Sequence, residues 1–125
     1  MGVWRQQRLT KRAQFAELYD RGKPWANALL VLRALPNGLC FNRYGFVVSG
    51  KLGKAVVRNR LRRQLREAAR AIPTKAGWDV VFIARKPAAG ADYWKLRAAM
   101  EELLKRARLQ SVEQTGSAGE VKEGK

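Results

Sequence analysis

The sequence contains no histidine, one cysteine and only ten acidic residues among 125. Without histidine, the chain has no side chain whose ordinary pKa lies near neutrality, and no imidazole base to activate a serine or cysteine nucleophile. Histidine-dependent hydrolases are therefore excluded. The single Cys40 excludes an internal disulfide and a cysteine-based metal site. We interpret it as a small buried residue in a strand of a protein kept in a reducing cytoplasm.

The acidic residues are too dispersed to form a two-metal carboxylate site. Glu101 and Glu102 are the only adjacent pair, and neighbouring residues of a helix point in different directions. The chain also has no phosphate-binding loop of the Walker type and no cluster of metal ligands. We therefore expect no catalytic residue, no metal-binding residue and no cofactor bound by this chain.

Long apolar runs are missing as well. No segment approaches the roughly 20 apolar residues that span a bilayer, and no apolar run follows the basic residues near the start as it would in a signal peptide. We expect a cytoplasmic protein that does not bind a membrane. A basic protein on a membrane surface would need an amphipathic helix free to insert its apolar face, whereas the apolar faces here look committed to a core.

Positive charge dominates what the sequence does contain. Lys and Arg number 26, the formal net charge is +16 and the sequence pI is about 11.1. Eight cations and one acid lie between residues 51 and 70. A chain this cationic favours a polyanionic partner, and nucleic acid is the leading candidate.

Residues 56–72 are predicted to form a helix with two contrasting faces. Arginine outnumbers lysine here, which suits bidentate contacts to phosphate. A solvated basic face is the alternative, but such helices usually mix charges to form i,i+4 pairs. At about 100° per residue, the apolar stripe holds Val57, Leu61, Leu65, Ala68 and Ile72, and the opposite side holds Asn59, Arg62, Arg63, Arg66 and Arg70.

The remaining pattern predicts one domain, residues 1–109, followed by a disordered tail, residues 110–125, that has too few apolar residues to offset its ordering entropy. The predicted order is helix, strands, helix, strand, helix. The predicted elements are a helix capped by Thr10 and stopped by Gly22, a hairpin of strands 28–35 and 39–49 with a bulge at Gly45, the basic helix, a central strand 79–85 and a helix 92–109.

Residues 51–67, centred on Arg58, Asn59 and Arg60, closely resemble the signature of the bacterial ribonuclease P protein component. A basic helix alone is shared by many ribosomal proteins, but here several further blocks follow in the family's order and span most of positions 5–109. They are Arg8-Leu9 with Phe15 and Tyr19, Ala26-Asn27, residues 44–49 and residues 79–87.

The resemblance implies a protein subunit that partners a large catalytic RNA to remove the 5′ leader from precursor tRNA. In that family the RNA positions Mg²⁺ and activates water, so the metal is expected with the RNA subunit. No obligate protein partner is expected. The implied fold is an α/β (α+β) two-layer sandwich, a small mixed sheet with about three helices and a left-handed crossover through the basic helix. General strand-connection rules would instead predict a right-handed crossover.

The resemblance also implies two RNA surfaces. One is the basic helix, and the other is a leader-binding cleft between the first helix and the sheet. For Phe15, a place in the core and a place in this cleft are given equal weight, whereas the hydroxyl of Tyr19 favours the aqueous edge of the cleft. Two departures, Arg33 at a strand position where some members carry an aromatic residue and Gly50 where a second lysine often stands, affect the detailed leader preference. The implied contacts to the catalytic RNA are Arg58, Asn59, Arg60, Arg62, Arg63 and Arg66, and those to the precursor leader are Phe15, Tyr19, Lys51, Lys54, Arg85 and Lys86.

The main alternative is a structural, ribosomal-type RNA-binding protein with no role in cleavage. It would share the positive charge and the lack of catalytic groups. The RNA that copurifies with the protein separates the two hypotheses, because one predicts a large non-ribosomal RNA with precursor-cleaving activity and the other predicts ribosomal RNA.

Overall fold

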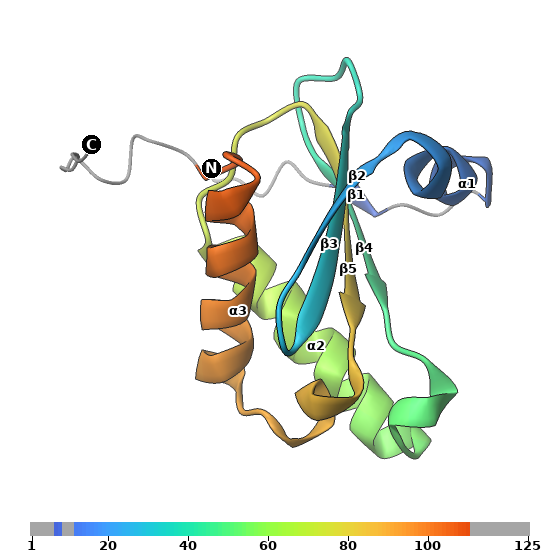
Figure 1. The fold of residues 1–125 in the computed structure, drawn as a ribbon, viewed down its shortest axis with the longest axis vertical. Coiled ribbons are helices and arrows are strands. Elements are labelled where there is room, and N and C mark those ends of the chain that lie inside the picture. Colours follow the sequence, from blue (N-terminus) through green and yellow to red (C-terminus); the bar gives the residue numbers. More distant parts are fainter. Residues whose placement is uncertain (1–6, 9–11, 111–125) are drawn as a thin grey trace, which may run out of the picture.

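The computed structural model describes residues 7–8 and 12–110, with side chains from residue 13 onward. A mixed sheet forms its centre, with two helices on one face and one helix on the other (Figure 1). The elements are β1 (Gln7–Arg8), α1 (Arg12–Arg21), β2 (Lys23–Ala26), β3 (Leu30–Pro36), β4 (Arg43–Val47), the 3-10 turn η1 (Gly50–Leu52), α2 (Ala55–Ala71), β5 (Trp78–Ala84), the 3-10 turn η2 (Lys86–Gly90) and α3 (Tyr93–Arg106). The predicted α+β class, mixed sheet and three helices are confirmed.

The strands lie in the order β1-β4-β5-β3-β2. β4 pairs in parallel with both β1 and β5, and β3 pairs antiparallel with β5 and β2. The predicted central position of the 79–85 strand is confirmed. Its residues Val80, Val81 and Phe82 are fully buried, as expected for a strand covered on both faces.

The predicted hairpin between residues 28–35 and 39–49 is wrong, because β5 lies between β3 and β4. The apolar β5 takes the central place, and the connection after β3 passes over its end, where Asn37 N donates a hydrogen bond to Gly77 O at 2.9 Å. The hairpin that does form joins β2 to β3. Asn27 organises its turn, since its Oδ1 accepts hydrogen bonds from Leu29 N and Leu30 N.

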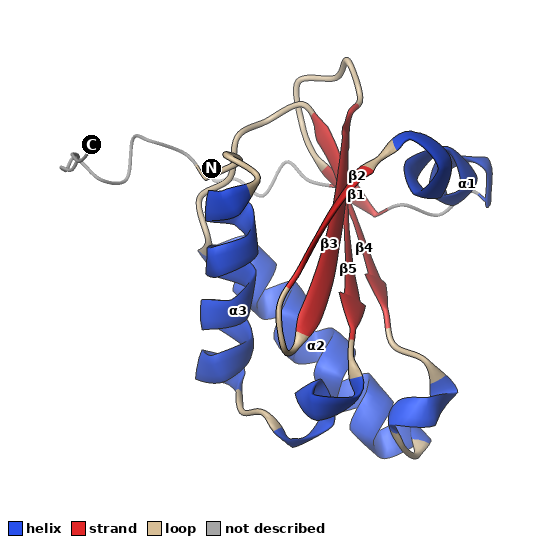
Figure 2. Ribbon diagram, viewed as in Figure 1, coloured by secondary structure: helices blue, strands red, loops and turns tan. Residues whose placement is uncertain are grey.

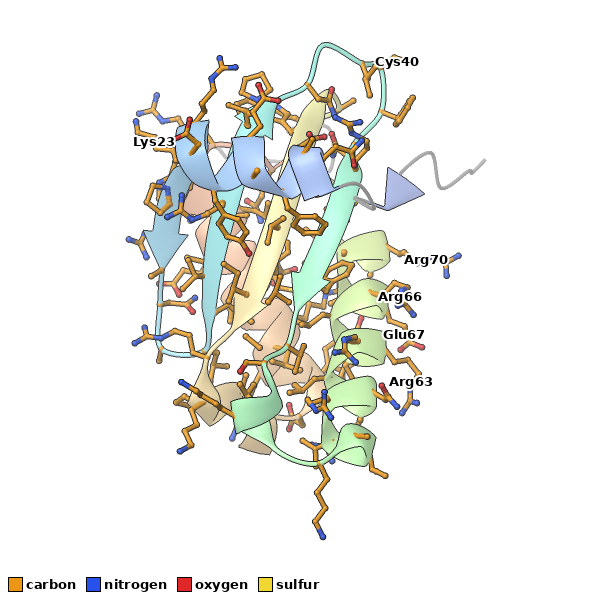
Figure 3. The ribbon with its side chains drawn as sticks, turned by 90° about the vertical axis from the view of Figure 1, so that its right-hand side faces the viewer. Lys23, Cys40, Arg63, Arg66, Glu67 and Arg70 are labelled. Carbon is orange, nitrogen blue, oxygen red and sulfur yellow. The ribbon has the colours of Figure 1, made fainter. Side chains whose placement is uncertain are left out.

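The crossover from β4 through α2 to β5 is left-handed. With α1 toward the viewer, α2 lies behind the sheet, both parallel strands run downward and β5 lies to the left of β4 (Figure 3). This is the rare hand implied by the family resemblance and the opposite of the general rule.

The main core lies between the sheet and the α2–α3 layer (Figure 2). Leu61, Leu65 and Leu96 are fully buried there, opposite strand residues such as Leu32 and Phe82. A smaller cluster on the other face joins α1 to the sheet and is built on the buried Leu18 and Val81. Successive side chains of β5 therefore point to opposite faces of the sheet, Val80 and Phe82 into the main core and Val81 into the smaller cluster.

Two further interpretations are wrong. Cys40 is exposed in the loop between β3 and β4 rather than buried in a strand (Figure 3). Gly45 forms no bulge, because it pairs regularly with Val81 in the β4–β5 ladder. A Cβ at Gly45 would lie 2.9 Å from the Phe15 ring, so this glycine makes room for that side chain.

The predicted helix ends lie within one residue of the observed ones except at the end of α3, which stops at Arg106, three residues before the predicted end at residue 109. α2 occupies 55–71 rather than 56–72, and α3 begins after Asp92, whose side chain accepts a hydrogen bond from Lys95 N at 2.9 Å. Gly22 follows α1, but the predicted cap Thr10 lies outside the described residues, as does the predicted tail from residue 111 onward. No helix of the described part is both long and apolar enough to cross a bilayer.

Candidate nucleic-acid interface

The two faces predicted for α2 are present in the structure. Leu61, Leu65 and Ala68 are buried against the sheet. Arg63, Arg66 and Arg70 extend together from the opposite side of the helix, away from the sheet, with Glu67 among them (Figure 3). Asn59 is exposed as well. The helix therefore packs by one face and presents guanidinium groups on the other.

The predicted RNA-contacting arginines fall into two groups. Arg63 and Arg66 are exposed, whereas Arg58, Arg60 and Arg62 are half-buried. Backbone oxygens hold the second group in place. Arg58 Nε donates to Gly53 O at 3.2 Å, Arg60 Nη2 to Ala89 O at 3.0 Å, and Arg62 Nη2 to Val48 O at 3.5 Å.

These tethers direct the guanidinium groups to different neighbours. Arg60 reaches the η2 turn, while Arg62 reaches the end of β4 and also donates to Asn59 Oδ1 at 3.1 Å. A tethered guanidinium keeps further N–H donors and loses less rotamer freedom when it meets a phosphate. The ion pairs Arg21–Glu17, Arg43–Asp79 and Arg97–Glu101 involve none of these five predicted arginines, whose guanidinium groups form no salt bridge within the described residues.

On the other face of the sheet, α1 places the predicted aromatic pair. Phe15 is half-buried and packs on Gly45 and Val81, while Tyr19 is 41% exposed. Phe15 therefore belongs at least partly to the small core beneath α1. Tyr19 lies at the edge of this small core with its ring exposed, a position that suits its polar hydroxyl group.

Arg33 contacts Tyr19 directly. Its guanidinium carbon lies 5.5 Å from the centre of the Tyr19 ring, and its Nη1 donates to Tyr19 O at 3.1 Å and to Gly22 O at 3.2 Å. Sequence reasoning noted Arg33 only as a departure from the family. Nothing in the sequence around Arg33 indicated that its side chain would donate hydrogen bonds to the C-terminal end of α1 and stack on the Tyr19 ring.

The four predicted cations lie at the end of the sheet where β4 and β5 finish. Lys51 belongs to η1 and Lys86 to η2, and these two turns lie against each other. Lys54 and Arg85 are exposed nearby in the chain, although Arg85 Nη1 donates to Asn27 O at 2.6 Å. Figure 3 shows α1 across the opposite end of the sheet. No helix covers this face of the strands between α1 and the end that carries these cations.

An open pocket of about 400 Å³ lies where α2 meets the η2 turn. Arg60 and Gln64 line it from α2, and residues 89–92 line it from the other side. Gln64 Oε1 is buried and has no hydrogen-bond partner within the described residues. Sequence reasoning missed this pocket, because nothing local to the sequence brings residues 89–92 to α2.

Several acidic side chains of the described residues have structural partners of their own. Asp79 pairs with Arg43, Asp92 caps α3, and Glu102 Oε1 accepts a hydrogen bond from Asn27 at 2.9 Å. No group of three or more acidic or cysteine side chains that could hold a metal ion occurs within that part of the chain.

The fold and the site together define a small, strongly basic α+β protein with an arginine-rich helix on one side and a partly open sheet face on the other. Comparison with known proteins makes the assignment specific. The sequence model of the ribonuclease P family matches residues 3–108. The chain therefore belongs to the family of ribonuclease P protein components.

Individual relatives agree with this assignment. The ribonuclease P protein component of Caldanaerobacter subterraneus is 44% identical over 104 residues, covering 82% of this chain and 90% of that protein. The one from Roseiflexus castenholzii is 46% identical over 103 residues, covering 80% and 84%. The solved ribonuclease P protein of Staphylococcus aureus superimposes with a TM-score of 0.76 at 32% identity, covering 83% of this chain and 97% of that one. The protein from Thermotoga maritima gives 0.72 at 37%, covering 80% and 96%.

Proposed function

We propose that this protein is the RNA-binding subunit of a cytoplasmic ribonucleoprotein that removes the 5′ leader from precursor tRNA. Membership of the ribonuclease P protein family supports the holoenzyme, and the net charge of +16 supports an RNA partner. The observation that carries the proposal is the arginine-rich surface of α2, where exposed Arg63 and Arg66 are flanked by the tethered Arg58, Arg60 and Arg62, none of which forms a salt bridge within the described residues.

The α2 face binds the catalytic RNA. Exposed Arg63 and Arg66 neutralise phosphates, and the tethered Arg58, Arg60 and Arg62 offer donors already fixed in direction. Asn59 supplies an amide between them. RNA helices are recognised mainly through their backbone and shape, which suits a stripe of arginine better than a set of base-reading groups.

The α1 side of the sheet binds the single-stranded leader. Tyr19 offers an exposed ring on which a base stacks, and Phe15 supports the floor of that surface from the small core. The cations at the far end, Lys51, Lys54, Arg85 and Lys86, contact leader phosphates. The uncovered strand surface between α1 and these cations gives an extended chain a path (Figure 3).

Cleavage itself is assigned to the RNA subunit, with its Mg²⁺. The chain contains no histidine, and among its described acids Asp79, Asp92 and Glu102 are engaged in contacts that hold the fold. The protein contributes binding energy and positive charge. That charge reduces repulsion between the catalytic RNA and the precursor and lowers the Mg²⁺ concentration that the complex needs.

Reconstitution tests the proposal. The purified protein, freed of RNA, is assayed on precursor tRNA alone and then with ribonuclease P RNA at low and high Mg²⁺. We expect no cleavage by the protein alone and a strong stimulation of the RNA at low Mg²⁺, which fades as Mg²⁺ rises. Specific cleavage by the RNA-free protein would contradict the assignment of catalysis. Absence of stimulation, together with tight binding to ribosomal RNA, would favour the structural ribosomal-type alternative.

A further inference from the structure

Trp94 is unusually exposed for an indole. It lies in the first turn of α3, and 68% of its surface is accessible. Its ring is nonetheless held in place, because the Arg97 guanidinium carbon lies 5.6 Å from the ring centre and Tyr93 meets it edge to face at 5.0 Å. An exposed aromatic side chain that is fixed rather than buried is a ready surface for a flat ligand.

Trp94 belongs to neither proposed RNA surface, but it lies at the end of the molecule that holds η1, η2 and the start of α2, which carry residues of both (Figure 1). One flank of α3 faces β2, where Arg106 Nη1 donates to Ala26 O at 2.7 Å. At about 100° per residue, Arg97 points to the opposite flank, the one nearer α2. Trp94, stacked with Arg97, lies on that side, two residues after Asp92, which lines the pocket with Arg60 and Gln64.

The surroundings of this ring are cationic. The N-terminal ends of α2 and α3 lie at the same end of the molecule, together with η1 and η2 (Figure 1). That end carries Lys51, Lys54 and Lys86, all exposed, beside the half-buried Arg60 and Arg97. The exposed side chains of this end also include the apolar Val56 and the acid Asp92, and Glu101 Oε2 lies 3.5 Å from Arg97 Nε, but the five cations outnumber the two acids. Base stacking on an aromatic ring with phosphate contacts from arginine and lysine fits this arrangement.

We propose that Trp94, supported by Arg97, stacks on an unpaired nucleotide of the RNA partner and forms a third RNA contact at the α2–α3 end of the protein. The proposal rests on the proposed function for the existence of that RNA. It differs from the arginine face of α2 in its chemistry, because stacking is largely independent of charge.

The test measures the affinity of the full chain for ribonuclease P RNA at fixed salt. Trp94→Ala should weaken binding by about 5- to 150-fold, the range for loss of one stacked base, and Trp94→Phe should restore most of it. Val56→Ala is the matched control, since Val56 is a 79% exposed apolar residue at the same end without a ring. The slope of log affinity against log salt should stay unchanged in Trp94→Ala and become shallower in Arg97→Ala.

Fluorescence gives a second readout. The difference between wild type and Trp94→Phe isolates the emission of this indole, which the RNA should quench. Wild-type affinity of a folded Trp94→Ala variant, in a series where Arg66→Ala weakens binding, would overturn this inference and leave the proposed function intact. A change of oligomeric state in Trp94→Ala without a change of RNA affinity would overturn it in favour of a protein contact. Failure of the wild type to bind the RNA would overturn both.

Discussion

The guanidinium of Arg33 covers the ring of Tyr19 and at the same time donates hydrogen bonds to the backbone oxygens of Tyr19 and Gly22. One strand residue thus fixes the C-terminal end of α1 and the direction of its exposed ring. The exposed Tyr19 side chain is therefore prepared for a stacking partner rather than free to adopt many rotamers, which reduces the entropy lost on binding.

Tyr19→Ala should lower affinity for a precursor tRNA by about 1–3 kcal/mol if one leader base stacks on the ring, and leave affinity for leaderless mature tRNA nearly unchanged. The measurement compares both substrates at saturating catalytic RNA, so that assembly defects do not appear as substrate defects. Arg33→Met, which keeps an unbranched side chain without the charge, should show part of the same loss. Equal weakening of precursor and mature tRNA would place Tyr19 outside the leader site.

Substitutions of the exposed and of the tethered arginines of α2 should change the salt dependence of RNA binding alike but should differ in their effect on the stability of the fold. Arg63→Ala and Arg66→Ala remove exposed cations, so each should make the log-log salt slope of RNA binding shallower by roughly 0.7–0.9 with nearly unchanged unfolding free energy. Arg60→Ala should also destabilise the fold by about 1 kcal/mol, because it breaks the hydrogen bond to Ala89 O. Salt titrations and urea unfolding measure the two effects. Unchanged slopes across folded variants would make this face a solvated surface.

Gly45→Ala should destabilise the protein by about 1–3 kcal/mol, the usual cost of overpacking. The added Cβ would lie 2.9 Å from the Phe15 ring and 3.2 Å from Val81 Cγ2, in a ladder that cannot shift without breaking strand pairs. Phe15→Leu should partly relieve the clash, so the double variant should lose less than the sum of the two single ones. Additive losses in urea unfolding would show that Phe15 and Gly45 do not contact each other.

Arg43 and Asp79 form a bidentate pair of 2.7 and 2.8 Å between β4 and β5, to which Asn37 Nδ2 adds a hydrogen bond to Asp79 at 3.0 Å. Arg43→Met should cost about 2–3 kcal/mol, because it leaves the buried Asp79 without its cation; partial exposure of Arg43 keeps the loss below that of a fully buried pair. Arg43→Lys should recover only part, since lysine cannot form both hydrogen bonds.

The pH dependence of this pair has a definite sign. The hydrogen bonds that Arg43 donates to the Asp79 carboxylate raise the pKa of Arg43 above its ordinary value. A raised pKa in the folded state gives stability that is complete below the unfolded value and lost only as pH rises through the folded one. Arg43 should therefore contribute no change of unfolding free energy between pH 6 and pH 10, measured as the difference in pH profile between wild type and Arg43→Met. A rise in the contribution of Arg43 with pH across that window would contradict it.

Periodicity and composition were sufficient to predict those helices and strands whose buried and exposed faces follow from residues close together in the chain. The apolar stripe of α2, including Leu61 and Leu65, and the continuous apolar run of β5 each follow from residues close together in the chain. The α2 arginine face follows from the same spacing. Whether those arginines and the α1 aromatics bind the two predicted RNAs stays a prediction, because their roles come from the family resemblance.

Strand order could not be read in the same way. Residues 28–35 and 39–49 looked like a hairpin because strands close in sequence usually pair, and no local signal shows that residues 78–84 will lie between them. Cys40 and Gly45 were misread for the same reason. Their surroundings depend on where the loop crosses β5 and where the Phe15 ring lies, and both are contacts across the fold.

The amino-acid sequence is sufficient to establish the charge of the protein, the absence of histidine chemistry, the two-faced basic helix and the family. These depend on residue identity and short-range spacing. The tertiary structure alone decided that Arg33 holds Tyr19, that Arg60 is tethered to the η2 turn and that Trp94 stands exposed beside Arg97 at the α2–α3 end. Those relationships join elements that are distant in sequence or depend on which helix face is covered, and only the folding of the whole sheet and its helices fixes them.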